Sequence, residues 1–398
     1  MNNKVILAFS GGLDTSYCAV WLSKVKNLEV HAVTVNTGGF SETEIQEIER
    51  HALSLGAVSF YHINEIEHYY DSVVKYLIFG NILKNSTYPL SVSAERIAQA
   101  AAIARYAKQQ GISKIAHGST GAGNDQVRFD MIFSILHPEA EILTPIRDMK
   151  LARSEEIDFL KANGVRMNFE KAAYSINKGL WGTSVGGKET LTSNLPLPEE
   201  AWPTPLTKSG EEIIELEFEK GELIALNGEK FSHPSLVIQY LQAIAQPFGI
   251  GRDIHVGDTI IGIKGRVGFE AAAPLIIIKA HHLLEKHILT KWQLYWKDQL
   301  SVWYGNSLHE GQYLDPTMRN IERFLVDTQR NVSGKVTVRM MQHRFVLEGI
   351  ESPNDLMSAK FGSYGEMNNS WSGEDVKGFT KIFGNQVAMY HHVHPEEL

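Results

Sequence analysis

The sequence has little cysteine, no excess of positive charge and no long apolar stretch, and each of these deficits excludes a class of protein. Of 398 residues only Cys18 is a cysteine, so neither an internal disulfide nor a four-cysteine zinc site can form. The net charge of −8 argues against a general nucleic-acid or membrane-surface binder, which presents a basic face. No stretch approaches the roughly 18 apolar residues of a membrane span, and the N-terminal apolar run is too short for a signal peptide. We therefore expect a cytoplasmic, soluble protein of two or three domains.

Segments of strand length and helix length alternate through the first half of the chain. Apolar runs of strand length occupy residues 5–9, 30–35, 57–63, 114–117 and 142–146. Helical patterns follow at 16–25, 41–55 and 93–111, the second opened by a capping box at Ser41. This alternation predicts a doubly wound α/β fold with one parallel sheet. Ligands bind beyond the carboxyl ends of such strands, where the loops 10–16 and 118–128 lie.

The pattern changes after about residue 168 and predicts an α+β second half. Strand patterns cover 215–218, 222–226 and 259–263, and helical patterns cover 233–246, 277–302 and 315–329. From about residue 362 the chain is rich in Gly, Ser and Asn and closes on an apolar, aromatic segment. We therefore predict three parts, over residues 1–168, 169–361 and 362–398.

The most specific local pattern is a glycine-containing loop between the first predicted strand and the following helix. It consists of Ser10-Gly11-Gly12-Leu13-Asp14-Thr15-Ser16. Two glycines let the backbone turn tightly, so N–H groups, the helix N-terminus and hydroxyls can all face one anion. The loop is not a Walker A motif, because no Gly-Lys-Ser/Thr follows, and it is not the dinucleotide Gly-x-Gly-x-x-Gly pattern. A plain tight turn is the alternative, which the strand–loop–helix setting disfavours. We predict a phosphate-binding loop.

This loop resembles the pyrophosphate-binding loop of the N-type ATP pyrophosphatases, and Thr15 before Ser16 makes it similar to that of the argininosuccinate synthase family. A second segment carries the same resemblance, namely His117-Gly118-Ser119-Thr120-Gly121-Ala122-Gly123-Asn124-Asp125-Gln126-Val127-Arg128-Phe129. The resemblance covers nearly the whole chain and weakens after about residue 360. It implies an ATP-binding domain of the pyrophosphatase type over 1–168, a synthetase domain over 169–361 and an oligomerisation tail over 362–398.

The resemblance also implies an activity. Such an enzyme joins citrulline to aspartate with ATP and magnesium, through a citrullyl-AMP intermediate, and releases argininosuccinate, AMP and pyrophosphate in arginine biosynthesis. It implies a cytoplasmic homotetramer whose C-terminal segments reach across subunits. The expected partners are small molecules (citrulline or an N-acyl-citrulline, aspartate and ATP), with no nucleic acid and no membrane.

Roles for individual residues follow from the same resemblance. Those implied for ATP are Ala8, Phe9, Ser10, Gly11, Gly12, Leu13, Asp14, Thr15, Ser16, Val35 and Gly118. Those implied for the amino-acid substrates are Tyr88, Ser93, Thr120, Asn124, Asp125, Arg128, Ser175, Ser184, Gly257 and Phe269. Asp14, Asp125 and Arg128 are expected to carry the chemistry, and Asp125 is expected to meet the ammonium of aspartate. The sequence assigns no magnesium ligands, because Asp14 either assists the ion or orients the loop.

Structural roles compete with some of these assignments. Ser93 could instead cap a helix over 94–110, and Arg128 could serve in a structural ion pair. Ser175 and Ser184 lie in a glycine-rich stretch that could be a solvated loop without a ligand.

The segment 256–270 departs from the family pattern. Gly257 and Phe269 stand where more familiar members have a glutamate and a tyrosine that complete the citrulline site. Loss of the carboxylate removes a charge-assisted hydrogen bond worth roughly 1.5–3 kcal/mol from a citrulline ammonium. Either Asp258 or another acid substitutes and citrulline is free, or the substrate carries an acylated α-nitrogen whose acyl group fills the space at Gly257. The sequence leaves both open.

Two other functions share part of the pattern. Another ATP pyrophosphatase, such as a tRNA-modifying enzyme, needs a basic surface and often paired cysteines, and both are lacking. A non-catalytic nucleotide-binding module of the same fold needs neither the 120–128 loop nor a large second domain.

Overall fold

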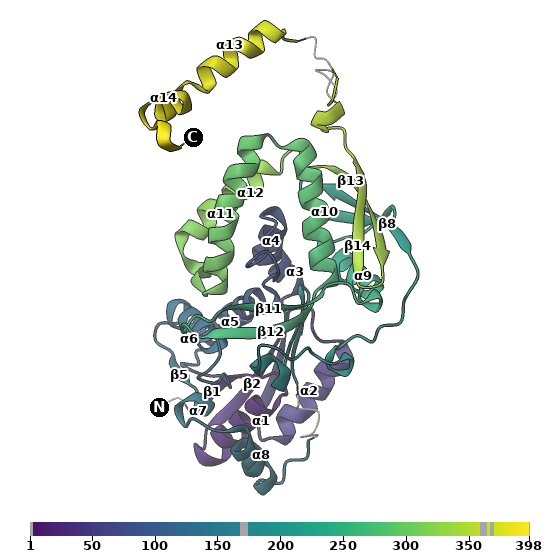
Figure 1. The fold of residues 1–398 in the computed structure, drawn as a ribbon. Coiled ribbons are helices and arrows are strands. Elements are labelled where there is room, and N and C mark those ends of the chain that lie inside the picture. Colours follow the sequence, from purple (N-terminus) through teal and green to yellow (C-terminus); the bar gives the residue numbers. More distant parts are fainter. Residues whose placement is uncertain (1–2, 168–173, 359–363, 367–369, 398) are drawn as a thin grey trace. The chain divides into compact units, whose positions relative to one another are not determined.

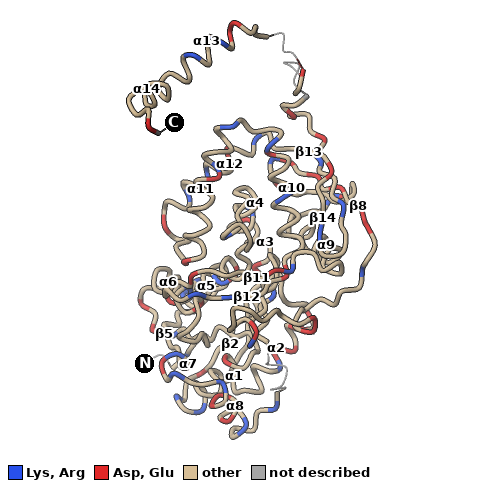
Figure 2. The backbone as a smooth tube through the Cα atoms, in the orientation of Figure 1, with Lys and Arg blue, Asp and Glu red and all other residues tan. Residues whose placement is uncertain are grey.

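The structure is a computed structural model that describes residues 3–167, 174–358, 364–366 and 370–397 (Figure 1). The chain separates into two compact units, Met1–Ser352 and Pro353–Leu398. None of the helices among these residues combines the length and the apolar character that a bilayer-spanning segment requires. Acidic and basic residues are interspersed along the chain (Figure 2).

A five-stranded parallel sheet forms the N-terminal part of the first unit, in the order β3-β2-β1-β4-β5. Its strands are β1 (Lys4–Ala8), β2 (Glu29–Asn36), β3 (Ser59–Asn64), β4 (Lys114–Ala116) and β5 (Glu141–Leu143). Val5 and Leu7 of β1 pack on one side, while Ile6 packs on the other. Both faces are buried because side chains alternate along a strand. The predicted doubly wound α/β domain is confirmed.

Helices cover both faces of this sheet. On one side lie α1 (Leu13–Val20), α2 (Glu42–Ser54) and α8 (Arg153–Ala162). On the other lie α5 (Ser91–Gln109) and α6 (Asp125–Leu136). The remaining helices of this part are α3 (Ile66–Tyr69), α4 (Lys75–Phe79) and α7 (Pro145–Asp148), with π-helical turns at Trp21–Val25 and Tyr70–Val74. The predicted capping box exists, because the Ser41 hydroxyl accepts from the Glu44 N–H and the Glu44 carboxylate accepts from the Ser41 N–H.

The rest of the first unit is α+β, as predicted. One antiparallel sheet has the order β10-β9-β8-β13-β14 and comprises β8 (Glu212–Glu219), β9 (Glu222–Leu226), β10 (Glu229–Lys230), β13 (Gly334–Met341) and β14 (Arg344–Glu351). A second has the order β11-β12-β7-β6 and comprises β6 (Ser175–Gly179), β7 (Gly182–Gly186), β11 (Arg252–Asp258) and β12 (Lys264–Glu270). The helices are α9 (Pro234–Ala245), α10 (Ala272–Ile288), α11 (Lys291–His309) and α12 (Pro316–Thr328).

Three predicted elements are wrong in detail. The expected strand 259–263 is the turn between β11 and β12, closed by hydrogen bonds of Thr259 with Ile263. The expected helix 277–302 is two helices, because Thr290 caps a new helix with Gln293 in a capping box. Helix α5 begins at Ser91, so Ser93 lies inside it and does not cap it.

The second unit holds α13 (Gly373–Phe383) and α14 (Asn385–Val393), and none of their residues is buried. Phe379 and Phe383 of α13 stack on each other, with ring centroids 5.1 Å apart, and are 62% and 77% exposed. These two helices therefore carry apolar side chains that no core among the described residues of the unit buries.

Candidate active site

A cavity of about 950 Å³ opens at the carboxyl edge of the parallel sheet. The loops after β1, β2 and β4 line it, and so does the start of α5. The β6–β7 hairpin, the β11–β12 pair and His309 at the end of α11 complete its wall. Both loops singled out in the sequence, 10–16 and 118–128, therefore contribute to one cavity.

The phosphate loop joins β1 to α1. Gly11 has a φ of +78°, which L side chains rarely adopt, and the Gly12 carbonyl accepts from the Ser16 N–H (2.9 Å) and Ser16 Oγ (2.7 Å). The Ser16 hydroxyl also lies 2.9 Å from His51 Nε2, so it is engaged within the fold. Ser10 and Thr15 lie at the cavity with their hydroxyls 3.4 Å apart, and no side chain caps the N-terminus of α1. The hydroxyls and free N–H groups suit an anion.

The second loop approaches the first closely at Gly118. A Cβ at this position would lie 3.1 Å from the Asp14 carbonyl carbon and from its Cβ, so a larger residue would separate the loops. Further along, the Asn124 side chain accepts from the Ile260 N–H (2.8 Å), which ties this loop to the β11–β12 turn. The loop 118–128 thus contacts both the phosphate loop and the β11–β12 turn.

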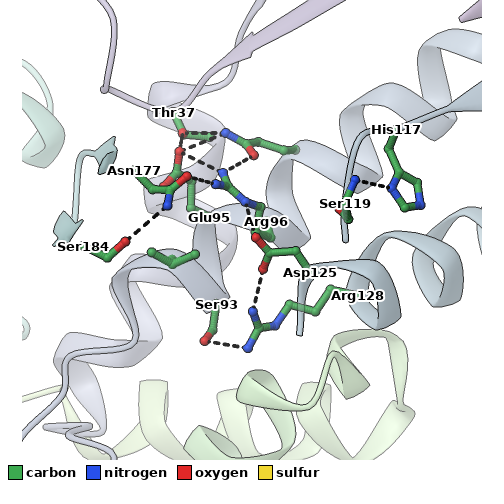
Figure 3. A network of polar contacts seen from close by, with 12 residues as sticks. Thr37, Ser93, Glu95, Arg96, His117, Ser119, Asp125, Arg128, Asn177 and Ser184 are labelled. Carbon is green, nitrogen blue, oxygen red and sulfur yellow. Dashed lines mark hydrogen bonds and ion pairs between the residues drawn. The ribbon is translucent and has the colours of Figure 1, made fainter. Parts of the chain in front are cut away.

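Asp125, the first residue of α6, lies between two arginines (Figure 3). Its Oδ2 accepts from Arg96 Nε (3.0 Å) and its Oδ1 from Arg128 Nη1 (2.8 Å). Burial alone would raise the pKa of Asp125, but Arg96 and Arg128 hold it below its usual value. Asp125 is therefore an ionised carboxylate held between two guanidinium groups.

Arg96 links three elements of the site. Besides Asp125 it donates to Gln99 Oε1 (2.8 Å) on its own helix and to Asn177 Oδ1 on β6. Asn177 Nδ2 lies 3.4 Å from Ser184 Oγ on β7, so the hairpin is joined to α5 (Figure 3). Beside it, burial raises the pKa of Glu95, whose Oε1 accepts from Thr37 Oγ1 (2.8 Å).

Arg128 and Ser93 meet the end of α11. Arg128 Nη2 donates to Ser93 Oγ (3.0 Å) and to the His309 carbonyl (2.8 Å), and Ser93 Oγ lies 2.9 Å from His309 Nδ1. Burial, with Arg128 and Lys84 nearby, lowers the pKa of His309 to about 3. His309 is therefore neutral at physiological pH, and the charge here is that of Arg128.

The β11–β12 wall carries His255 and Gly257. The His255 ring stacks on the Tyr88 ring, with centroids 5.1 Å apart at 22°. Burial and Lys84 lower the pKa of His255. The Phe269 ring packs against the Tyr88 ring, with centroids 5.3 Å apart. Phe269 is fully buried and does not line the cavity.

Asp14 shares a hydrogen bond with Glu156 of α8 at the edge of the phosphate loop. Burial raises the pKa of Asp14, and burial together with Asp14 raises that of Glu156 to about 8. The pair therefore retains a proton near neutral pH in the absence of a cation.

Two family models together match almost the whole chain. One, described as the arginosuccinate synthase N-terminal HUP domain, matches residues 4–166, and the other, described as the arginosuccinate synthase C-terminal domain, matches residues 174–390.

The chain belongs to the argininosuccinate synthase family.

Curated argininosuccinate synthases resemble it over nearly their full length. That of Methanocaldococcus jannaschii is 35% identical over 396 residues, covering 98% of both chains. That of Pyrococcus furiosus is 34% identical, covering 98% of this chain and 95% of the relative. That of Xylella fastidiosa is 33% identical over 405 residues, covering 98% of both. The expected family and enzyme class are confirmed, and ATP as a substrate fits the family.

Most residues that the argininosuccinate synthase resemblance assigned line the cavity. Those of the nucleotide set that do so are Ala8, Phe9, Ser10, Gly12, Leu13, Asp14, Thr15, Val35 and Gly118. Those of the amino-acid set are Tyr88, Ser93, Thr120, Asn124, Asp125, Arg128, Ser175, Ser184 and Gly257. Gly11, Ser16 and Phe269 do not line the cavity. Gly11 and Ser16 belong to the phosphate loop, and the Phe269 ring packs against Tyr88. These placements leave the individual roles as predictions.

The cavity residues that the sequence did not assign include Arg96, Asn177, His255 and His309. Arg96 lies in an alanine-rich helix whose spacing gives no hint of a ligand role, and His309 is 181 residues away from Arg128. His255 was detectable in principle, since it stands two residues before Gly257 on one strand.

Proposed function

We propose that this cavity catalyses the ATP-dependent condensation of citrulline with aspartate, through a citrullyl-AMP intermediate, in arginine biosynthesis. The observation that carries the proposal is the joining of two sites in one cavity. A loop suited to phosphate and a carboxylate held between two arginines both line it.

The phosphate loop would hold the pyrophosphate end of ATP. The open N–H groups of α1 and the hydroxyls of Ser10 and Thr15 supply donors without net positive charge. Gly118 closely approaches Asp14, so the two loops lie side by side and the nucleotide could contact both from the cavity. The α-phosphate would then face the acceptor.

Two displacements follow. The ureido oxygen of citrulline attacks the α-phosphorus of ATP and pyrophosphate leaves, and the aspartate amine then attacks the ureido carbon and AMP leaves. Asp125, ionised between Arg96 and Arg128, keeps lone pairs to accept hydrogen bonds from the aspartate amine. Arg128 and Ser93 lie where they can orient citrulline. The protein acts mainly by positioning and charge stabilisation.

Magnesium fits the residues present. This ion needs only one or two protein carboxylates when phosphate oxygens supply the other ligands. Asp14 lines the cavity beside the phosphate loop, and its carboxyl, which shares a hydrogen bond with Glu156, is a hard oxygen donor. The bound ion would neutralise charge on the phosphates, and Asp14 would hold it.

The acceptor is citrulline itself or a citrulline acylated on its α-nitrogen, and the two differ in whether that nitrogen is charged. We place the enzyme in the cytoplasm as a homotetramer. The exposed apolar side chains of α13 and α14 support an interface between copies, because the second unit has no buried core among its described helices.

A release assay tests the proposed function. Purified protein with ATP and magnesium is given aspartate and an acceptor, together and singly, and pyrophosphate and AMP are measured. We expect equal amounts of both only when acceptor and aspartate are present together. Release stimulated by tRNA, or release without aspartate beyond one pyrophosphate per active site, would contradict the proposal.

A further inference from the structure

The β11–β12 wall is unsuited to a free ammonium group, and this bears on the acceptor. The charged groups around it come from several elements. Lys84 and Arg128 supply positive charge close enough to depress the pKa of His309, and Lys84 does the same for His255. His255 and His309 are themselves neutral or positive, never negative.

The carboxylates near this wall are all engaged. Both oxygens of Asp125 accept from arginines. Asp258 is paired with Lys264 at 2.5 Å, and its side chain is 69% exposed. Glu310 and Asp258 both act on Lys84, and neither Lys84 nor Glu310 lines the cavity. Glu95, which also lines the cavity, accepts from Thr37 and Gln99 and lies 3.7 Å from Arg96. Each of these carboxylates therefore has a partner already, and the lone pairs left on Asp125 are those assigned to the aspartate amine.

The space beside Gly257 is already occupied. A Cβ at Gly257 would lie 2.5 Å from His255 Nε2, so the imidazole stands where a side chain of residue 257 would begin. The expectation that an acyl group fills this space is therefore wrong in that detail. The substrate would instead meet the His255 ring, which Tyr88 supports by stacking.

A neutral imidazole is matched to an amide better than to a cation. It offers one N–H donor and one acceptor, and an acylated α-nitrogen offers a carbonyl acceptor and an N–H donor. A free α-ammonium would instead be desolvated beside Arg128, while the carboxylates of Asp125 and Asp258 are already paired with cations, which is unfavourable.

We propose that the physiological acceptor is citrulline acylated on its α-nitrogen, with the amide against His255. The inference rests on the proposed function and names its substrate class. The bonds made and broken remain those of the ureido group, and the acyl group takes no part in them.

The experiment measures kcat/KM for three acceptors, namely citrulline, Nα-acetyl-citrulline and Nα-succinyl-citrulline, with ATP and aspartate fixed. We expect at least a tenfold preference for an acylated acceptor. Equal or better use of free citrulline would overturn this inference and leave the proposed function standing. If none of the three acceptors supports aspartate-dependent pyrophosphate release, the proposed function itself would be overturned.

A matched pair of variants tests the role of His255. His255→Glu places a carboxylate on this wall, and His255→Gln is its uncharged counterpart of the same size. We expect His255→Glu to shift the ratio of kcat/KM towards free citrulline by at least tenfold relative to His255→Gln. The comparison is between two variants, and thermal unfolding establishes that both are folded. An identical ratio in the two would contradict the assigned position of the α-nitrogen.

Discussion

At the scale of single residues, Arg96 is the group on which the polar part of the site depends. One guanidinium orients Asp125 from α6 and Asn177 from β6 (Figure 3). It also donates to Gln99 on α5. Arginine suits this position because its planar fork of donors binds several acceptors in fixed directions. Asp125 keeps its orientation towards the cavity only while both arginines hold it.

Replacement of Arg96 by glutamine therefore should impair the use of aspartate more than the binding of ATP. The lost charge-assisted hydrogen bond is worth roughly 1.5–3 kcal/mol, so kcat/KM for aspartate should fall about 10- to 100-fold. Arg105→Gln is the matched control, because Arg105 lies on the same helix and pairs with Glu65 at an exposed site. Steady-state kinetics with each substrate varied in turn measures the effect. Equal losses for aspartate and ATP would argue against a positioning role.

His281 makes the stability of the protein depend on pH. It is fully buried in α10, with Nδ1 2.7 Å from Asn81 Oδ1 and Nε2 2.9 Å from Gln329 Oε1, and Glu285 and Lys297 lie nearby. Burial lowers its pKa to about 4 from its ordinary value of 6.5. Between these values the unfolded chain binds the extra proton, so stability is lost as the pH falls below 6.5.

This single group should contribute a loss of about 2 kcal/mol in the free energy of unfolding between pH 7.5 and pH 5. His281→Gln, which cannot take up the proton, should be less stable at pH 7.5 but should lose less on acidification. Urea unfolding at several pH values gives the slope of the free energy of unfolding against pH for the parent protein and for His281→Gln. Parallel slopes for both proteins would show that another group causes the dependence.

At the scale of secondary-structure elements, the sequence predicts what depends on local periodicity. The central strands β1 and β2 are nearly continuous apolar runs because both of their faces are buried. The edge strands β3 and β5 hold no buried residue, and the alternation of strand and helix patterns located them. Strand β11 escapes the same reasoning because its burial is inverted, with Val256 55% exposed and His255 6% exposed. A strand that turns polar residues towards a ligand does not show the ordinary alternation.

The residues of the candidate site divide in the same way, into those that a local pattern predicts and those that it does not. Ser10, Thr15 and Asp125 were predictable because short motifs hold them on loops at the sheet edge. Arg96 and His309 were not, because their roles arise from side chains that meet only after helices α5, α6 and α11 have packed. Tertiary contacts of this kind leave no local pattern in the sequence.

The β6–β7 hairpin is positioned by backbone contact at Gly39. A Cβ on this residue would lie 1.9 Å from the Lys178 carbonyl oxygen, and the Leu180 N–H donates to the Thr37 carbonyl beside it. The hairpin carries Asn177 and Ser184, so its packing against the loop after β2 determines where these two residues lie.

Gly39→Ala should therefore displace the hairpin and reduce both stability and activity. Overpacking of this kind costs about 1–3 kcal/mol, because backbone atoms have to move. Gly210→Ala is the matched control, since no heavy atom lies within 4 Å of a Cβ there. Thermal unfolding and kcat/KM for the citrulline acceptor report the two effects. Unchanged values in Gly39→Ala would mean that the hairpin tolerates the shift.

At the scale of the whole molecule, the two described helices of the second unit have no buried core to stabilise them. Helix α13 has 11 residues and α14 has 9, and isolated helices of that length are marginal in water. Val376, Phe379 and Phe383 are spaced as one face of α13, and all are exposed within one chain. Such a face requires a partner, and another copy of the chain is the partner we propose.

Two aspartates on this face should weaken the assembly without touching the cavity. In Phe379→Asp/Phe383→Asp, the charges would have to be buried against another copy, which is costly. The molar mass from light scattering during size-exclusion chromatography should fall from that of a tetramer to that of a smaller species. Lys381→Asp is the control, because residue 381 projects about 200° around the helix from residues 379 and 383. It should keep the parent mass. An unchanged mass in the double variant would exclude this face of α13 from the interface and leave the tetramer to other surfaces.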